Sequence, residues 1–172
     1  MKIIFLDIDG VLNYEEYYVR GRVVTTYPLS EICPIAVSNV NRIVEATGAK
    51  VVISSTWRHS GMKYCIDVLA ECGFTGEIID ITPSLDINGS WVERGNEILK
   101  WLQDNKRYKY DQYKVTDHDY AIIDDDSDML YQQRHNFFEC SPKTGLTVEL
   151  ADKIIAFLNE HGGKTGPQEL TR

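Results

Sequence analysis

Short apolar runs, each ended by an acidic or hydroxyl residue, are the feature of this sequence that most constrains the fold. Five such runs occur along the chain: Lys2–Leu6, Lys50–Ile53, Glu77–Ile81, Tyr120–Ile123 and Asn136–Cys140. Runs of this length are typical of strands that are buried on both faces of a parallel sheet. Asp7 follows the first run, Ser54 the second and Asp124 the fourth.

Between the runs, apolar residues recur at helical spacing. Four stretches are predicted as helices on this basis: 35–48, 62–72, 94–103 and 150–161. Asp126 and Asp128 suit the first turn of a further short helix through 129–130. Strands that alternate with helices predict an α/β fold with a mainly parallel sheet. The chain has 172 residues, about one domain's worth, so we expect a single domain over 1–161 and a flexible C-terminal tail over 162–172.

Two segments fit this alternation poorly. Asn13–Glu31 is rich in Tyr, Val and Thr around Gly21. It predicts a small β-hairpin flap that projects from the end of the first strand and, with its linker, occupies residues 13–34. Residues 104–119 are polar and are predicted as an inserted loop.

The overall charge limits the partners that this chain can bind. It carries 26 acidic and 18 basic residues, a formal net charge of −8, which argues against stable non-specific binding to duplex nucleic acid. No apolar stretch approaches the ~20 residues that span a bilayer, and the acidic start of the chain is unlike a signal peptide. We therefore expect no membrane association and a cytoplasmic location, where the four cysteines stay reduced.

The residues that end the strands carry the chemistry. In open α/β sheets, ligands bind at the edge where the carboxyl ends of neighbouring strands meet. This would bring Asp7, Asp9 and the acidic run 124–126 together. Two like charges ~4 Å apart repel by about 4 kcal/mol at an effective dielectric near 20, and a divalent cation removes that cost. All-oxygen ligands favour Mg²⁺ over zinc, and which residues of 124–126 bind it stays open.

The tetrapeptide Asp7-Ile-Asp9-Gly10 places two carboxylates on the same side of an extended chain, because side chains alternate with a period of two. One carboxylate can attack an electrophile while the other moves a proton, which divides one difficult displacement into two easier steps. Gly10 lets the backbone turn away and approach a bound ion or ligand closely.

These features together resemble the haloacid dehalogenase (HAD) superfamily of phosphotransferases. The family's four motifs match, in chain order, Asp7-Ile-Asp9-Gly10 after an apolar strand, Ser54 at a strand end, Arg94 at a helix start, and Asp124-Asp125 at the end of a later strand. Lys114 is a second candidate for the third motif. The Asp-Gly-Val-Leu-Asn and Ser-Ser-Thr-Trp-Arg segments are similar to small HAD domains of bacterial, phage and nucleic-acid repair proteins.

The resemblance implies a Rossmann-like three-layer core and a role for each matched residue. Asp7 would be the nucleophile that forms an aspartyl-phosphate, and Asp9 would be the acid and then the base. Ser54 would hydrogen-bond the phosphoryl group, and Arg94 would offset its charge. The implied ligands of an Mg²⁺ cofactor are Asp7, the carbonyl of Asp9, and Asp124 or Asp125. A second aspartate at the position of Asp9 favours a phosphatase over a dehalogenase.

The segments between the motifs leave no room for a large cap domain, so the site would be open to a bulky substrate or to a cap from a second chain. Substrate contacts are predicted at Gly10 and, after the second motif, at Ser55, Trp57 and Arg58. Trp57 could stack on a base and Arg58 could contact a phosphate. Alternatively, Trp57 packs against a loop and Arg58 forms a surface ion pair. The expected partner is a phosphorylated small molecule or a nucleic-acid end.

The favoured function is a Mg²⁺-dependent phosphomonoester hydrolase that works through an aspartyl-phosphate, with a nucleotide or a nucleic-acid terminal phosphate as substrate. The alternative is a HAD-like domain that binds Mg²⁺ and a phosphorylated ligand without useful turnover. A receiver-like domain also gathers aspartates at strand ends. It would, however, carry the acidic pair after its first strand, the reverse of the order in this chain.

Overall fold

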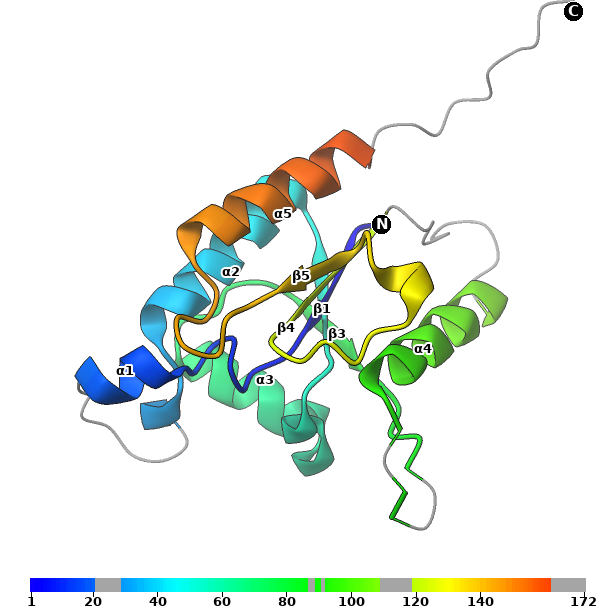
Figure 1. Ribbon diagram of the computed structural model, residues 1–172, viewed down its shortest axis with the longest axis horizontal. Coiled ribbons are helices and arrows are strands. Elements are labelled where there is room, and N and C mark those ends of the chain that lie inside the picture. Colours follow the sequence, from blue (N-terminus) through cyan, green and yellow to red (C-terminus); the bar gives the residue numbers. More distant parts are fainter. Residues whose placement is uncertain (21–28, 87–88, 91, 109–118, 162–172) are drawn as a thin grey trace, which may run out of the picture.

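A single parallel sheet organises the part of the chain that the computed structural model describes, residues 1–20, 29–86, 89–90, 92–108 and 119–161. Its strands are β1 (Ile3–Leu6), β2 (Lys50–Ile53), β3 (Ile78–Ile81), β4 (Tyr120–Asp124) and β5 (Phe137–Glu139). They lie in the order β3-β2-β1-β4-β5, and every neighbouring pair is parallel (Figure 1). The prediction of an α/β fold with a parallel sheet is confirmed.

Helices cover both faces of the sheet. They are α1 (Glu15–Arg20), α2 (Pro34–Thr47), α3 (Met62–Glu71), α4 (Arg94–Tyr108) and α5 (Val148–His161), with the 3-10 turns η1 (Leu29–Glu31), η2 (Thr56–Ser60) and η3 (Tyr131–Gln133). In Figure 1, α2 and α5 lie side by side on one face and α4 lies on the other. The four helices predicted from apolar spacing are thus present, and α4 is longer than expected.

The alternation of side chains along β1 divides the core into two layers. Ile4 and Leu6 belong to the cluster that packs against α2, α3 and α5, whereas Ile3 and Phe5 belong to the cluster that packs against α4. The Phe5 ring meets the Trp101 ring of α4 edge to face, with centroids 5.3 Å apart. Because both faces of β1 are covered, the strand is apolar throughout, as its sequence predicts.

The direction of the chain reverses around β1, and this reversal positions the candidate site. From β1 the chain runs outward through α2, β2 and α3 to β3, and it then returns through α4 to β4 on the other side of β1. The reversal lies between β1 and β4. In open α/β sheets, the crevice at the carboxyl ends of the strands beside such a reversal is the usual ligand site.

The predicted β-hairpin flap is wrong where the structure describes it, because residues 15–20 form helix α1. The backbone N–H groups of Glu15 and Glu16 donate to the carbonyls of Pro142 and Lys143, at 3.0 Å each. Tyr17 is buried in the core cluster under α2. These tertiary contacts stabilise a helix in a segment whose composition favours a strand. Residues 21–28 of the predicted flap lie outside the described residues.

The short helix expected through residues 129–130 is also absent from the described chain; only the turn η3 follows. Asp128 instead accepts a hydrogen bond from the backbone N–H of Arg94, at 2.7 Å from its Oδ2, at the first residue of α4. It therefore caps a different helix from the one predicted. Helix α4 continues to Tyr108, into the segment predicted as a loop. Lys114 and the predicted tail lie outside the described residues.

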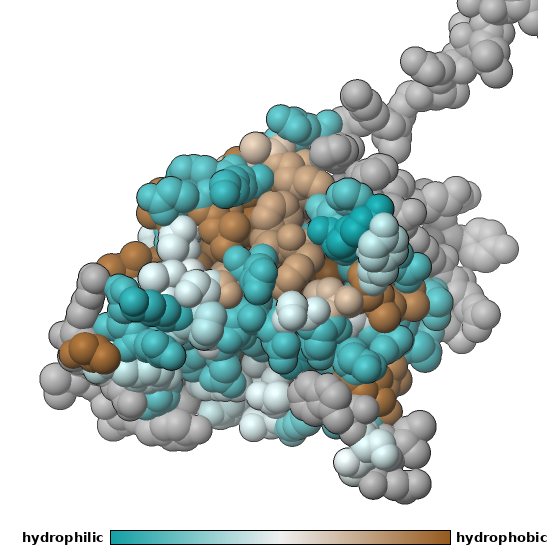
Figure 2. Space-filling model, in the orientation of Figure 1, coloured by the Kyte–Doolittle hydropathy of each residue, from teal (hydrophilic) through white to brown (hydrophobic). Residues whose placement is uncertain are grey.

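Most of the surface in Figure 2 is hydrophilic, and apolar side chains gather over β5 beside α5. Two of the β5 side chains, Phe137 and Phe138, are only half-buried, and the Phe138 ring contacts the Phe157 ring of α5 at 5.3 Å between centroids. Strand β5 forms one edge of the sheet. Among the described residues, none of the helices is sufficiently long and apolar to cross a membrane.

Candidate active site

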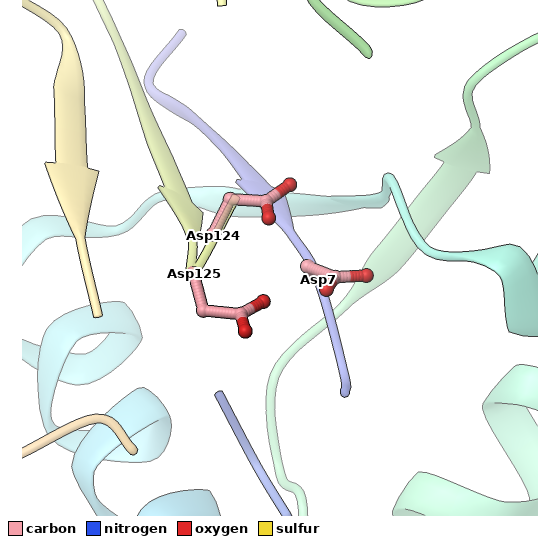
Figure 3. Close-up of side chains that lie close together, drawn as sticks. All are labelled: Asp7, Asp124 and Asp125. Carbon is pink, nitrogen blue, oxygen red and sulfur yellow. The ribbon is translucent and has the colours of Figure 1, made fainter. Parts of the chain in front are cut away.

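Three carboxylates gather where β1 and β4 end. Asp7 directly follows β1, Asp124 is the last residue of β4, and Asp125 comes next. The register of Leu6 with Ile123 sets Asp7 beside Asp124, and one carboxylate oxygen of each aspartate lies within 4.8 Å of those of the other two. Figure 3 shows the three side chains directed toward the same side of these strand ends. We call Asp7, Asp124 and Asp125 the carboxylate cluster.

The carboxylate cluster is largely removed from water. Asp7 is 6% exposed and Asp124 is 2% exposed. Burial raises the pKa of Asp7 to about 7, although the Arg94 guanidinium opposes the shift. Burial, and next the charge of Asp7, raise the pKa of Asp124 to about 8, and burial also raises the pKa of Asp125. A bound cation would stabilise the ionised forms that burial and like charge disfavour.

Gly10 allows Asp125 to take its place in the cluster. Gly10 has a φ of +72°, in the left-handed region that glycine adopts without strain. A Cβ at this position would lie 2.1 Å from Oδ2 of Asp125, closer than any real contact. The backbone turn after β1 and the acidic end of β4 therefore touch only because residue 10 has no side chain.

Asp9 differs from the cluster, because its side chain is exposed and is held by hydrogen bonds. Nδ2 of Asn13 donates to its Oδ1 at 2.7 Å. The indole Nε1 of Trp57 lies 3.2 Å from Oδ1 and 3.1 Å from Oδ2. Asn13 is buried, and its Oδ1 accepts the N–H of Gly10 at 2.9 Å. The turn after β1 and the loop after β2 thus meet at the Asp9 carboxylate.

Two buried hydroxyls follow β2. The backbone N–H of Ser54 donates to the Leu6 carbonyl at 2.8 Å, which sets Ser54 next to Asp7 across the strand pair. The Ser54 hydroxyl has no hydrogen-bond partner among the described residues, although it is buried. The Ser55 hydroxyl forms a hydrogen bond to Asp7 that lowers the pKa of that carboxyl against the larger effect of burial. Its Oγ also accepts the Trp57 backbone N–H at 3.4 Å, which begins η2.

Arg94 brings a positive charge to the same edge. It is the first residue of α4 and is only 8% exposed, with Nε 3.8 Å from Oδ2 of Asp124. The Asp128 carboxylate and the Gln133 side chain hold the start of α4, since Gln133 Nε2 donates to the Gly95 carbonyl at 2.9 Å. The end of β4 and the loop after it thus carry two cluster aspartates and also position Arg94.

The Arg58 side chain is directed into the protein, toward Glu97 of α4, which Arg94 also faces. Its Nη2 donates to Oε2 of Glu97 at 2.6 Å, and its Nη1 donates to the Ser55 carbonyl at 2.8 Å. Oε2 of Glu97 lies 3.6 Å from Nη1 of Arg94, and Oε1 accepts the Leu85 N–H at 3.1 Å. We call Arg58, Arg94 and Glu97 the arginine cluster. All three side chains are buried.

A comparison with known protein families identifies the family of this chain. The model of the family described as "HAD domain in Swiss Army Knife RNA repair proteins" matches residues 3–151. The chain belongs to this family. No curated protein and no solved structure matches it. The resemblance to small HAD domains of repair proteins, inferred from the motif residues, is confirmed, and the core of the HAD domain is the five-stranded parallel sheet described above.

The donor set of this HAD domain fits a divalent cation of the Mg²⁺ type. The carboxylate cluster offers oxygen ligands only, from Asp7, Asp124 and Asp125. Asp124 Oδ2 is buried and has no hydrogen-bond partner among the described residues. A buried carboxylate oxygen without a donor is costly unless a cation or a proton occupies it. The cluster is consistent with the metal site of a HAD domain.

The HAD domain brings most of the predicted site residues to one edge of the sheet. They are Asp7, Asp9, Gly10, Ser54, Ser55, Arg94, Asp124 and Asp125. Trp57 also reaches this edge, but its N–H is directed at Asp9 rather than away from the protein. Arg58 is 6% exposed and is paired with Glu97, so its charge is directed inward.

Sequence reasoning missed the residues that hold the predicted ones in place. Glu97 is three residues after Arg94, and helical spacing alone would have placed both on one face of α4. Asn13 is four residues after Asp9, within the reach of a turn. Asp128 has the residue type of a helix cap, but no local pattern identifies the helix that it caps, and none identifies Gln133, because each acts on a helix start more than thirty residues earlier in the chain.

Proposed function

We propose that this HAD domain is a Mg²⁺-dependent phosphomonoester hydrolase that works through an aspartyl-phosphate on Asp7. The carboxylate cluster at the end of β1 and β4, in a chain that matches a HAD family over residues 3–151, carries this proposal. Membership of the family suggests phosphohydrolase activity, and the motif Asp7-Ile-Asp9-Gly10 supplies both carboxylates that such a reaction needs.

In the first step, a carboxylate oxygen of Asp7 attacks phosphorus while the bond between phosphorus and the leaving oxygen breaks. Asp9 gives a proton to that oxygen, and the leaving group departs as an alcohol. In the second step, Asp9 takes a proton from water as the water oxygen attacks phosphorus. The bond to Asp7 breaks and inorganic phosphate leaves, with both carboxyls returned to their starting states.

The remaining site residues would orient the phosphoryl group and offset its negative charge. Bound Mg²⁺ would supply positive charge next to the phosphoryl oxygens, held by Asp7, the Asp9 carbonyl, and Asp124 or Asp125. The Ser54 hydroxyl, which has no partner among the described residues, is available to donate to a phosphoryl oxygen. Arg94 adds a fixed guanidinium beside the cluster. Phosphoryl transfer depends mainly on such positioning and charge neutralisation.

For the substrate, we propose a terminal phosphate of RNA. The family's description places its HAD domains in RNA repair proteins. A cavity of about 360 Å³ with a mixed polar and apolar lining lies beyond Arg58, and His59, Thr82, Ser84 and Asn105 are among its lining residues. These side chains offer hydrogen-bond donors and acceptors of the kind that a ribose and a base require. Arg58 of the arginine cluster lines this cavity and no residue of the carboxylate cluster does, so it would take a nucleoside of the RNA rather than the terminal phosphate itself.

The proposal is tested by phosphate release from an aryl phosphate and from 3′- or 5′-phosphorylated oligoribonucleotides, with and without Mg²⁺. Asp7→Asn should lower turnover by at least about a thousandfold, because it removes the nucleophile. The matched control is Asp67→Asn, which changes an exposed carboxylate on α3 that pairs with Lys63.

Two outcomes would contradict the proposal. One is an Asp7→Asn variant that keeps the turnover of the wild type. The other is a folded wild type that binds Mg²⁺ and releases no phosphate from any ester. The second outcome would favour the alternative, a domain that binds a phosphorylated ligand without cleaving it.

A further inference from the structure

The contact between Trp57 and Asp9 joins two motifs of the chain that sequence reasoning treated separately. Asp9 lies in the turn after β1, and Trp57 lies in η2, after β2. The indole Nε1 is within 3.2 Å of both carboxylate oxygens of Asp9. Trp57 was expected to contact the substrate, but in the structure its only polar atom is directed at another side chain of the site.

We propose that Trp57 is a positioning residue for Asp9, holding this carboxyl at the orientation in which it exchanges its proton with the leaving group. This inference rests on the proposed function. Asp9 is the one motif carboxylate that lies exposed, outside the buried cluster, so packing does not restrict its side chain. Hydrogen bonds must restrict it instead, and the distances show which donors do so.

Both donors are themselves held in place. Asn13 is 5% exposed and is tied to the turn by the Gly10 N–H. Trp57 is half-buried, its backbone N–H donates to the Ser55 hydroxyl, and its ring lies against the Tyr64 ring of α3 with centroids 6.3 Å apart. Two donors that are themselves held in place limit the rotation of the exposed Asp9 carboxylate more than two freely rotating donors would.

The two oxygens of Asp9 are not equivalent in this arrangement. Oδ1 receives both the Asn13 amide and the indole N–H, whereas Oδ2 receives only the shared indole N–H. Oδ2 therefore keeps more of its capacity for a further partner. We assign Oδ2 as the oxygen that gives its proton to the leaving oxygen in the first step and takes a proton from water in the second.

The test is the dependence of the rate on the leaving group. Dinitrophenyl phosphate has a leaving group that departs without a proton, while an alkyl phosphate or an RNA terminal phosphate needs one. Trp57→Phe keeps an aromatic ring against Tyr64 and removes only the N–H. It should lower kcat/KM for the alkyl ester by about a hundredfold, as expected for a misplaced catalytic group, and for the dinitrophenyl ester by less than about tenfold.

Trp101→Phe is the matched control. The Trp101 indole also donates to a carboxylate, Asp80 Oδ2 at 2.7 Å, but both residues line the cavity beyond Arg58 and lie away from Asp9, where neither small ester reacts. Losing that N–H should change the rates for both esters by the same factor. A Trp57→Phe variant that behaves in this uniform way would show a merely structural role and overturn the proposal.

If Trp57→Phe lowers kcat/KM only for RNA substrates and leaves both small esters unaffected, Trp57 stacks on a base. That result would also overturn the proposal. A second measurement does not need turnover: the indole N–H resonance of Trp57 should move and exchange faster with solvent in Asp9→Ala, while that of Trp101 stays unchanged. An unmoved Trp57 resonance would overturn the contact itself. If the wild type cleaves neither ester, the proposed function has failed, whatever the resonance shows.

Discussion

The carboxylate cluster and the arginine cluster lie at the same edge of the sheet, yet their charges are arranged in opposite ways. The first gathers three like charges, with an Asp124 oxygen that no described residue hydrogen-bonds. The second sets the Glu97 carboxylate against two guanidiniums and gives it a backbone N–H as well. The first cluster needs a cation or bound protons to offset its charge, whereas in the second the opposite charges offset one another. The first arrangement suits the binding of a cation, and the second suits a structural role.

The largest effect is expected from breaking the arginine cluster. Glu97→Ala leaves buried Arg58 without its partner, and losing one member of a buried pair costs about 3–5 kcal/mol of unfolding free energy. Replacing both residues, Arg58→Met with Glu97→Leu, should recover part of that loss, because the Arg58 charge is then gone and Arg94 still has Asp124 beside it. Chemical denaturation of the purified variants measures both quantities.

An exposed ion pair serves as the control for this comparison. Lys63 and Asp67 are 2.7 Å apart on α3, and the Lys63 side chain is 86% exposed. Asp67→Ala should therefore cost less than about 1 kcal/mol. If Glu97→Ala costs no more than Asp67→Ala, the arginine cluster does not hold the shape of the site, and the contrast drawn between the two clusters is wrong.

The same contrast explains what the sequence could predict. The carboxylate cluster follows from local features, because Asp7 and the pair Asp124-Asp125 come at the ends of apolar strands and parallel strands end at one edge. The strand runs and the order of the motifs are one-dimensional patterns, and the family match bears out their interpretation. The arginine cluster depends on a contact between Arg58 and Glu97, which are 39 residues apart. Neither the spacing of apolar residues nor a sequence motif predicts a contact between two residues so far apart in the chain.

Two further errors have the same cause. Residues 15–20 have a strand-like composition but form a helix, whose first two N–H groups, those of Glu15 and Glu16, donate to the carbonyls of Pro142 and Lys143. Asp128 has the residue type and the surroundings of an N-cap, and it does cap a helix, but that helix begins 34 residues earlier. For Asp128 the residue type predicted the kind of interaction and tertiary structure selected the partner, whereas for residues 15–20 tertiary contacts changed the secondary structure itself.

A smaller effect is expected from adding a methyl group next to the carboxylate cluster. Gly10→Ala and Gly48→Ala both place alanine at positive φ, +72° and +68°, and each should cost about 1 kcal/mol in stability. Only at Gly10 would the new Cβ meet a neighbour, the Asp125 carboxylate, which must rotate out of the cluster. Titration by calorimetry should show Mg²⁺ affinity at least about tenfold lower, or 1.4 kcal/mol, in Gly10→Ala.

Gly48→Ala is the control, since nothing lies within 4 Å of its added Cβ. Its affinity for Mg²⁺ should equal that of the wild type, even though its stability falls. Equal affinities in all three proteins would mean that Asp125 does not belong to the metal site. In that case Asp7 and Asp124 alone would remain as candidate ligands from the carboxylate cluster.

The last prediction concerns how stability depends on pH without metal. Burial raises the pKa of Asp7 to about 7 and of Asp124 to about 8, from an ordinary value of 3.8. Between these limits the folded protein holds protons that the unfolded chain has released, so its stability is fully present below the ordinary value and falls as pH rises toward 8. Each such proton contributes at most about 1.4 kcal/mol per pH unit.

Asp124→Asn removes one of these protons while its side-chain oxygen can still accept the Asp126 N–H. The variant should therefore lose less stability than the wild type between about pH 5 and pH 8, as measured by denaturation in the presence of a chelator. Saturating Mg²⁺ should flatten the slope of the wild type in the same way, because the cation binds the ionised carboxylates. If the stability of the wild type and that of the variant fall equally with pH in chelator, burial does not hold a proton on Asp124. The contrast between this buried group of like charges and the paired charges of the arginine cluster would then be wrong.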